Sequence, residues 1–196
     1  MYRTIGKRTL DIVFTLFAIL ILAPFFIIIA AAIKLTDKGP VFFSQKRVTR
    51  GKEYFQILKF RTMRTTAPKD CPTHLLQNPD AFITPIGRFL RRTSLDELPQ
   101  LFNILAGDMS IVGPRPALWN QYDLIAERDK YGANDILPGL TGWAQINGRD
   151  ELPIEVKAKL DGEYAQRCSL TFDVEIIFNT AFVVFLAKGI KEGANV

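Results

Sequence analysis

The sequence predicts an α+β protein that is mainly helical and is held at a membrane by its N-terminal segment. Three observations support this fold class: a long uncharged stretch, two short strand-like segments around a turn, and several segments with helical spacing. The 196 residues suffice for one domain with its own core plus a membrane element. We therefore expect a membrane segment over residues 1–38 and a globular domain over residues 39–196.

The apolar stretch covers residues 12–33, where no side chain is charged and only Thr15 is polar. As a helix it would measure roughly 33 Å, close to the thickness of a bilayer core, about 30 Å. It is longer than the apolar region of a signal peptide, and no small-residue cleavage site follows it. A buried helix of a soluble protein is the alternative, but 22 uncharged residues in a row are typical of a membrane segment.

Pro24 lies in the middle of this stretch, and basic residues flank both of its ends. A proline inside a helix removes one backbone hydrogen bond and clashes with the preceding turn, so we expect a kink. By the positive-inside rule, the flanking charges place both ends in the cytoplasm; they are Arg3, Lys7, Arg8, Lys34 and Lys38. A re-entrant helix that turns at Pro24 satisfies both observations, while a kinked spanning helix is an equally open reading of these residues.

The remaining chain predicts a small β-hairpin followed by helices. Segments 41–45 and 54–60 have strand composition and surround a polar turn, and alternation places Lys59 and Arg61 on one face. Thr84-Pro85 is typical of a helix start, and the short amphipathic helix that follows suits a membrane interface. Further helices are expected at 98–105, 120–131, 153–166 and 174–190, with loops at 65–81, 113–116 and 138–149.

Charge is unevenly distributed along the chain. Residues 1–70 contain 13 Lys/Arg against 4 Asp/Glu, whereas residues 71–196 contain 12 against 16. A basic half beside an apolar stretch suits anionic lipids or phosphate-bearing ligands, and nucleic acid is the other partner it could serve. Cys71, Cys168 and the single histidine, His74, lack metal-ligand spacing, so a metal would be held by carboxylates, which favours Mg²⁺ or Mn²⁺.

Asp96 and Glu97 are adjacent carboxylates just before a predicted helix. In one interpretation, Ser94 and Glu97 form a capping box at the start of that helix, although Pro99 weakens this reading. In the other, both carboxylates lie outside the positive end of the helix, where one could attack as a nucleophile and the other could hold a metal. The residues alone leave both interpretations open.

Five basic residues lie in separate segments, each near a turn or an element end: Lys59, Arg61, Arg91, Arg115 and Arg149. Lysine and arginine bind phosphate, and arginine does so with two parallel hydrogen bonds. A fold that gathers these side chains beside the two carboxylates would form a site for a diphosphate and its Mg²⁺. Any one of them alone is more typically a solvated surface charge.

Three segments resemble the bacterial sugar transferase family, the monotopic phosphoglycosyl transferases: KFRTM (59–63), RRTSLDELPQLFNILAGDMSIVGPRP (91–116) and PGLTGWAQINGR (138–149). The resemblance covers roughly residues 3–190 and fits the minimal form of the family, without extra spanning helices. It implies that a UDP-sugar donates its phospho-sugar to undecaprenyl phosphate with release of UMP. This reaction is the first membrane step in the synthesis of a capsule, an O-antigen or another glycoconjugate.

The resemblance also implies roles for individual residues. Asp96 would be the nucleophile that forms a covalent phospho-sugar intermediate, and Glu97 would bind Mg²⁺ with it. The expected substrate- and phosphate-binding residues are Lys59, Arg61, Arg91, Arg115, Arg149 and Asp173. The stretch 115–131 resembles capsule-type members, which favours an N-acetylated amino or deoxyamino sugar.

Membership would further imply a re-entrant membrane helix broken at Pro24, although Ala23 replaces the serine of the family motif. The catalytic domain and both termini would then lie on the cytoplasmic side of the bacterial inner membrane. Its partners would be the UDP-sugar, undecaprenyl phosphate and membrane lipid but not nucleic acid, and a homodimer stays open. A membrane-tethered binder of nucleic acid or anionic lipid would explain the basic half, but not Asp96-Glu97 or the Gly-Pro-Arg-Pro segment.

Overall fold

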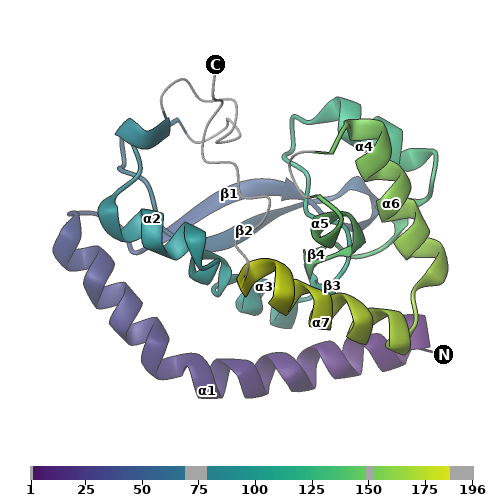
Figure 1. Cartoon of the computed structure of the whole chain (residues 1–196), viewed down its shortest axis with the longest axis horizontal. Helices are drawn as coiled ribbons and strands as arrows, with labels where there is room; N and C mark the ends of the chain where they lie inside the picture. The colour runs from purple at the N-terminus through teal and green to yellow at the C-terminus, as the bar shows by residue number, and fades with distance from the viewer. Residues whose placement is uncertain (1, 69–78, 149–151, 186–196) are drawn as a thin grey trace.

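The computed structural model describes residues 2–68, 79–148 and 152–185, and Figure 1 shows their arrangement. A long helix lies along one edge of the molecule, and the other elements pack on one side of it. In chain order they are a π-helical turn (Tyr2–Gly6), α1 (Lys7–Thr36), β1 (Phe42–Val48), β2 (Tyr54–Phe60), α2 (Pro85–Arg92), α3 (Gln100–Ala106), β3 (Ser110–Val112), α4 (Tyr122–Asp129), β4 (Gly139–Thr141), α5 (Trp143–Ile146), α6 (Ile154–Arg167) and α7 (Leu170–Phe185). The mainly helical fold with a small hairpin is confirmed.

The hairpin pairs β1 and β2 in antiparallel register, from Phe42 opposite Phe60 to Val48 opposite Tyr54. β1 extends three residues beyond its predicted end at residue 45 because Val48 is buried beside the core. The polar turn between the strands includes Gly51 with φ 69°, a conformation that glycine adopts without steric cost. β2 ends at Phe60, so Arg61 lies just beyond the strand.

Residues 138–149 contain a strand and a helix, so the prediction that they form only a loop is wrong. β4 pairs in parallel with β3, with Ser110 opposite Gly139, and α5 follows directly. The glycines permit this contact, because a Cβ on Gly139 would lie 2.1 Å from the amide nitrogen of Gly113. The glycine pattern therefore reflects close backbone packing here.

The helices begin near their predicted positions. α2 starts at Pro85, and the Thr84 hydroxyl accepts a hydrogen bond of 3.0 Å from the Gly87 amide, so the predicted N-cap is confirmed. α7 begins at Leu170, four residues before its predicted start. Its predicted end over 186–190 lies outside the described residues, as does most of the predicted loop 65–81.

α1 continues through Pro24 in the helical conformation, so the predicted break at this residue is not confirmed. Figure 1 shows instead a single helix that is bent in its middle. A proline removes only one hydrogen bond of the helical ladder, and its ring displaces the preceding turn. A proline can therefore bend a helix without ending it.

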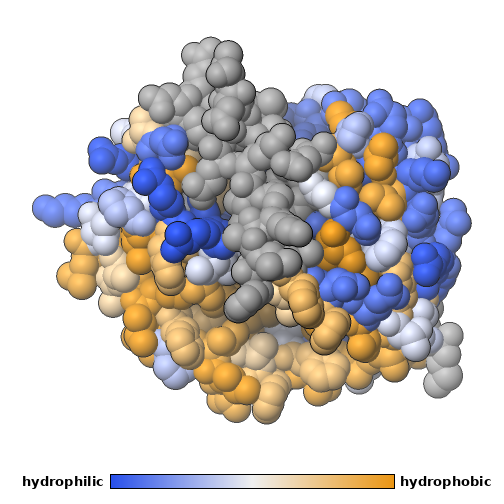
Figure 2. Space-filling view, viewed as in Figure 1, coloured by the Kyte–Doolittle hydropathy of each residue, from blue (hydrophilic) through white to orange (hydrophobic). Residues whose placement is uncertain are grey.

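Most of the apolar surface of α1 faces outward. The helix is long and apolar enough to cross a membrane, and only 11% of its most apolar 18-residue stretch is buried inside the protein. Figure 2 shows an apolar edge where α1 lies, and exposed apolar side chains of α3 and α7 include Phe102, Phe178 and Phe182. A core helix of a soluble protein would be mostly buried, so this exposure favours contact with lipid.

Both ends of α1 are attached to the globular domain by polar side chains. Near its start, Arg8 donates to the carbonyls of Ile104 and Leu105 at the end of α3 (2.5 and 2.9 Å), where a cation is favoured by the helix dipole. At its other end, the guanidinium of Arg61 donates to the Asp37 carbonyl at 2.7 Å. The apolar middle of α1 packs on the hairpin and on α3.

Candidate active site

Asp96 and Glu97 lie in a 3₁₀ turn, Leu95–Glu97, that joins α2 to α3. Ser94 precedes the turn with φ 56°, a left-handed conformation that is uncommon for residues other than glycine. Its side chain makes no capping hydrogen bond, so the capping-box interpretation is wrong. Asp96 and Glu97 therefore need another explanation.

Glu97 is held by two cations from distant segments. Its Oε1 atom accepts a hydrogen bond of 2.7 Å from Lys59 Nζ and one of 3.0 Å from Arg115 Nη2. Burial would raise the pKa of Glu97, but the charges of Arg115 and Lys59 outweigh it and hold that pKa well below its ordinary range. Glu97 is therefore ionised at neutral pH.

Asp96 has a different environment. Its residue is 8% exposed, and within ranges 2–68, 79–148 and 152–185 no hydrogen bond reaches its carboxylate. Burial raises the pKa of Asp96 to about 6, and the Glu97 charge adds to this effect while Lys59, Arg91 and Arg115 oppose it. A carboxylate without donors keeps its lone pairs available for attack on an electrophile.

Asn103 and Thr62, which lie outside the turn, hold Lys59 and Arg91 in position. Asn103 of α3 binds the backbone of β2 on both sides of Ile57: its Oδ1 accepts from the Leu58 amide and its Nδ2 donates to the Gln56 carbonyl, both at 2.9 Å. This amide fixes β2, and with it Lys59, against the helix that follows Asp96-Glu97. Arg91 at the end of α2 donates from Nε to the Thr62 hydroxyl at 2.9 Å.

Counting only the described residues, three cations act on Asp96, namely Lys59, Arg91 and Arg115, so they outnumber the two carboxylates when both are ionised. Such a surplus suits an anionic ligand, and guanidinium groups are well matched to phosphate. The structure therefore brings together both predicted catalytic residues and three of the predicted phosphate-binding residues.

Arg61 does not join this cluster. Besides its bond to the Asp37 carbonyl, its Nη1 atom lies 3.1 Å from Asp37 Oδ2, and the residue is 6% exposed. Arg61 therefore fastens the end of α1. Arg149 lies outside the described residues.

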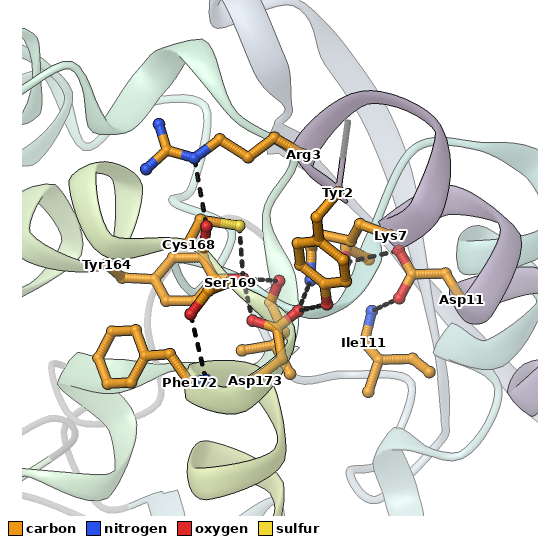
Figure 3. A network of polar contacts seen from close by, with 12 residues as sticks. Tyr2, Arg3, Lys7, Asp11, Ile111, Tyr164, Cys168, Ser169, Phe172 and Asp173 are labelled. Carbon is orange, nitrogen blue, oxygen red and sulfur yellow. Dashed lines mark hydrogen bonds and ion pairs between the residues drawn. The ribbon is translucent and has the colours of Figure 1, made fainter.

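Asp173 belongs to a second network, which Figure 3 shows from close by. Its Oδ2 accepts from the Tyr2 hydroxyl and from Lys7 Nζ, each at 2.5 Å, and its Oδ1 lies 2.7 Å from the Tyr164 hydroxyl. Burial raises the pKa of Tyr164, and the Asp173 charge raises it further, so this phenol stays protonated. The network connects the start of α1 to α6 and α7, and both oxygens of Asp173 are occupied.

Asp96 and Glu97 also provide the kind of ligands that Mg²⁺ prefers. Among the described residues, no group of three or more His, Cys, Asp or Glu side chains comes together. Magnesium typically binds proteins through one or two carboxylates and completes its shell with water and substrate phosphate oxygens. Two adjacent carboxylates beside a cluster of cations fit this requirement.

Residues 2–187 match the model of the bacterial sugar transferase family, and the chain belongs to this family of transferases. It is 42% identical over 190 residues to the UDP-glucose:undecaprenyl-phosphate glucose-1-phosphate transferase of Escherichia coli K12, covering 93% of this chain and 40% of that protein. It is 34% identical to the exopolysaccharide production protein ExoY of Sinorhizobium fredii, covering 94% of this chain and 88% of that one. The sugar transferase EpsL of Bacillus subtilis is 37% identical, over 97% and 92% of the two chains.

Proposed function

We propose that this chain transfers a phospho-sugar from a UDP-sugar to undecaprenyl phosphate and releases UMP. The observation that carries the proposal is the Asp96 carboxylate, which no described donor binds and which lies beside three cations. The name of the E. coli relative, of which this chain covers 40%, supports the same donor and acceptor classes. A phosphate-binding cluster with an available nucleophile is what a two-step phosphoryl-type transfer requires.

In the first step, a carboxylate oxygen of Asp96 attacks the β-phosphorus of the UDP-sugar. The bond between that phosphorus and the oxygen bridging to the α-phosphate breaks, and UMP leaves with this oxygen. The sugar stays attached through phosphate to Asp96 as an acyl phosphate. Because UMP departs before the acceptor reacts, the kinetics are ping-pong.

In the second step, a phosphate oxygen of undecaprenyl phosphate attacks the same phosphorus. The bond from phosphorus to the Asp96 oxygen breaks, which regenerates the carboxylate and gives undecaprenyl diphosphate-sugar. Both steps place negative charge on the phosphoryl oxygens and on the leaving group. Lys59, Arg91 and Arg115 stabilise this charge from fixed positions.

Asp96 and Glu97 would hold Mg²⁺, which when bound neutralises charge on the diphosphate and so makes it a better electrophile. Glu97 additionally fixes Lys59 and Arg115 through its two hydrogen bonds. Chelation by EDTA should therefore abolish UMP release, and added Mg²⁺ should restore it. Full activity in EDTA would remove the metal from the mechanism.

The same proposal includes a re-entrant path for α1, with the catalytic domain on the cytoplasmic face of the inner membrane. Its support is that polar contacts at both ends of α1 reach one globular domain, through Arg8 near the start and Asp37 at the end. A helix that crossed the bilayer would carry one end away from that domain. The bend seen in Figure 1 is compatible with a helix that enters and leaves at one face.

Topology can be tested by cysteine labelling in spheroplasts and inverted vesicles. Cysteines would be introduced at exposed positions on either side of the apolar stretch, Ile5 and Lys38, after replacing Cys71 and Cys168 by serine. Both positions should react with a membrane-impermeant maleimide only from the cytoplasmic side. Labelling from opposite sides would establish a spanning helix instead.

The reaction is tested by measuring UMP release with undecaprenyl phosphate and a panel of UDP-sugars. The panel should include UDP-glucose, which the E. coli relative's name specifies, and UDP-sugars with N-acetylated amino groups, which the segment 115–131 favours. We expect UMP release with at least one donor, dependent on undecaprenyl phosphate for repeated turnover. Absence of release across the whole panel would contradict the proposal.

A further inference from the structure

We propose that Arg128, held by Asp161, is a positioning residue that sets the place of Arg115 in the active site. Arg128 lies in α4 and Asp161 in α6, and neither residue is among those with a predicted role. Arg128 donates to Asp161 Oδ2 from Nε at 2.9 Å and from Nη2 at 2.6 Å, and Nη2 also donates to the backbone carbonyl of Arg115 at 2.9 Å. The inference rests on the proposed function, since it concerns the same site.

The Arg128–Asp161 ion pair is almost completely buried. Arg128 is 4% exposed and Asp161 is 1% exposed. Removing two charges from water is costly, and an apolar pair of the same volume is often equally stable. The structure therefore points to a specific role for this pair beyond stability. Within the described residues, the only backbone carbonyl to which the Arg128 side chain donates is that of Arg115.

The segment that carries Arg115 is held at successive backbone positions. Arg47 of β1 donates from Nη1 to the Pro116 carbonyl at 2.9 Å, while Gln45 Oε1 accepts from Arg47 Nη2 at 2.7 Å. Other backbone contacts of this segment include Asp11 with the Ile111 amide, Tyr164 with the Val112 carbonyl, the Gly113 amide with Thr141, the Pro114 carbonyl with Gly139, and the Ala117 carbonyl with Val48. The Arg115 carbonyl is held in the same way, by the hydrogen bond from Arg128.

Backbone position matters for Arg115 because its side chain is long and 38% exposed. The guanidinium reaches Glu97 at 3.0 Å, so the direction of the side chain depends on the position of the Arg115 backbone. A displacement of about 1 Å at a catalytic group can lower a rate by roughly a hundredfold. Loss of the Arg128 contact should therefore act on catalysis through Arg115.

The test is a double-mutant cycle on kcat/KM for the UDP-sugar, normalised to folded protein, with Arg128→Lys, Arg115→Ala and the double variant. Arg128→Lys alone should lower kcat/KM about 10- to 100-fold, and in the Arg115→Ala background it should lower it less than about threefold. Asp161→Asn, which leaves Arg128 in place, provides a second cycle with the same expectation. Equal losses in both backgrounds would overturn the inference, because the residue would then act independently of Arg115.

Hydrogen exchange of the peptide spanning residues 110–118 provides a measurement that does not depend on activity. Exchange should rise there in Arg128→Lys and in Asp161→Asn. It should not rise in Asn134→Ala, a control at a buried residue that removes hydrogen bonds to Ile125 and Asp129 of the same helix. Unchanged exchange in both test variants would overturn the inference. Failure of the wild-type chain to release UMP would instead contradict the proposed function, and the exchange measurement would still decide whether Arg128 positions the Arg115 backbone.

Discussion

The Asp96-Glu97 centre and the Asp173 network both bury carboxylates beside cations, but they use these carboxylates differently. Asp173 accepts hydrogen bonds at both oxygens, from Tyr2, Lys7 and Tyr164. Asp96 accepts none from the described residues, although Lys59, Arg91 and Arg115 all act on its charge. Within the described part of the chain, both oxygens of Asp173 have donors, whereas Asp96 has none and three cations lie near its pair of carboxylates.

This difference separates a structural network from a reactive one. A buried carboxylate that accepts hydrogen bonds at both oxygens stabilises the fold and is a weaker nucleophile than one that accepts none. A buried carboxylate without donors costs free energy, and such a cost is typical of functional sites. From this comparison we propose that Asp173 attaches α1 and that Asp96 takes part in the reaction, and four substitutions test this proposal.

Asp96→Asn should have the largest effect. The amide is not a nucleophile for phosphorus, so UMP release should fall by at least about a thousandfold. Membrane association and thermal stability should be unchanged or slightly higher, because the substitution removes a buried charge. Retention of substantial UMP release would show that Asp96 is not the attacking group.

Glu97→Gln should have the next largest effect, since it removes the charge that holds Lys59 and Arg115. We expect kcat to fall about a hundredfold and the Mg²⁺ concentration needed for half-maximal activity to rise. Glu53→Gln is the matched control because Glu53 is exposed and lies outside the cluster. Equal activity of both variants would exclude a catalytic role for Glu97.

Asp173→Asn should act on stability and little on catalysis. Breaking a buried ion pair leaves Lys7 without its partner and should lower the free energy of unfolding by about 3 kcal/mol. In detergent the melting temperature should fall, while kcat per folded molecule should change less than about threefold. A large loss of kcat at unchanged stability would move Asp173 into the active site.

Arg61→Gln should have the smallest effect. It removes the ion pair and hydrogen bond that fasten the end of α1, so we expect a loss of about 1–2 kcal/mol in stability. The KM for the UDP-sugar should be unchanged, in contrast to the phosphate-binding role predicted from the sequence. A clear rise in KM would restore that role.

Much of the fold could be predicted because it depends on local patterns. Apolar length predicts the membrane segment, alternation predicts the hairpin, and Thr84-Pro85 predicts the start of α2. The parallel pairing of β3 with β4 could not be predicted in this way. It depends on a contact between Gly113 and Gly139, which are distant in the sequence and lie in segments with the composition of loops.

The site could be predicted only in part, because its residues follow local motifs but their arrangement depends on long-range contacts. Resemblance in motifs identifies Asp96, Glu97 and the basic residues, but sequence does not reveal which cations meet at one point. Lys59 and Arg115 do so because Asn103 and Arg128 bind the backbones that carry them. These supporting residues look like ordinary polar helix residues, and only their tertiary partners reveal what they do.

The most direct test of the account is the mass of the intact protein after mixing with a UDP-sugar donor in the absence of undecaprenyl phosphate. The account predicts an increase equal to one phospho-sugar, matched by one equivalent of UMP, and peptide mapping should place the adduct on Asp96. Added undecaprenyl phosphate should remove it, and the Asp96→Asn variant should show none. An adduct on another residue, or steady UMP release with no adduct at any time, would contradict the assignment of Asp96 as the nucleophile.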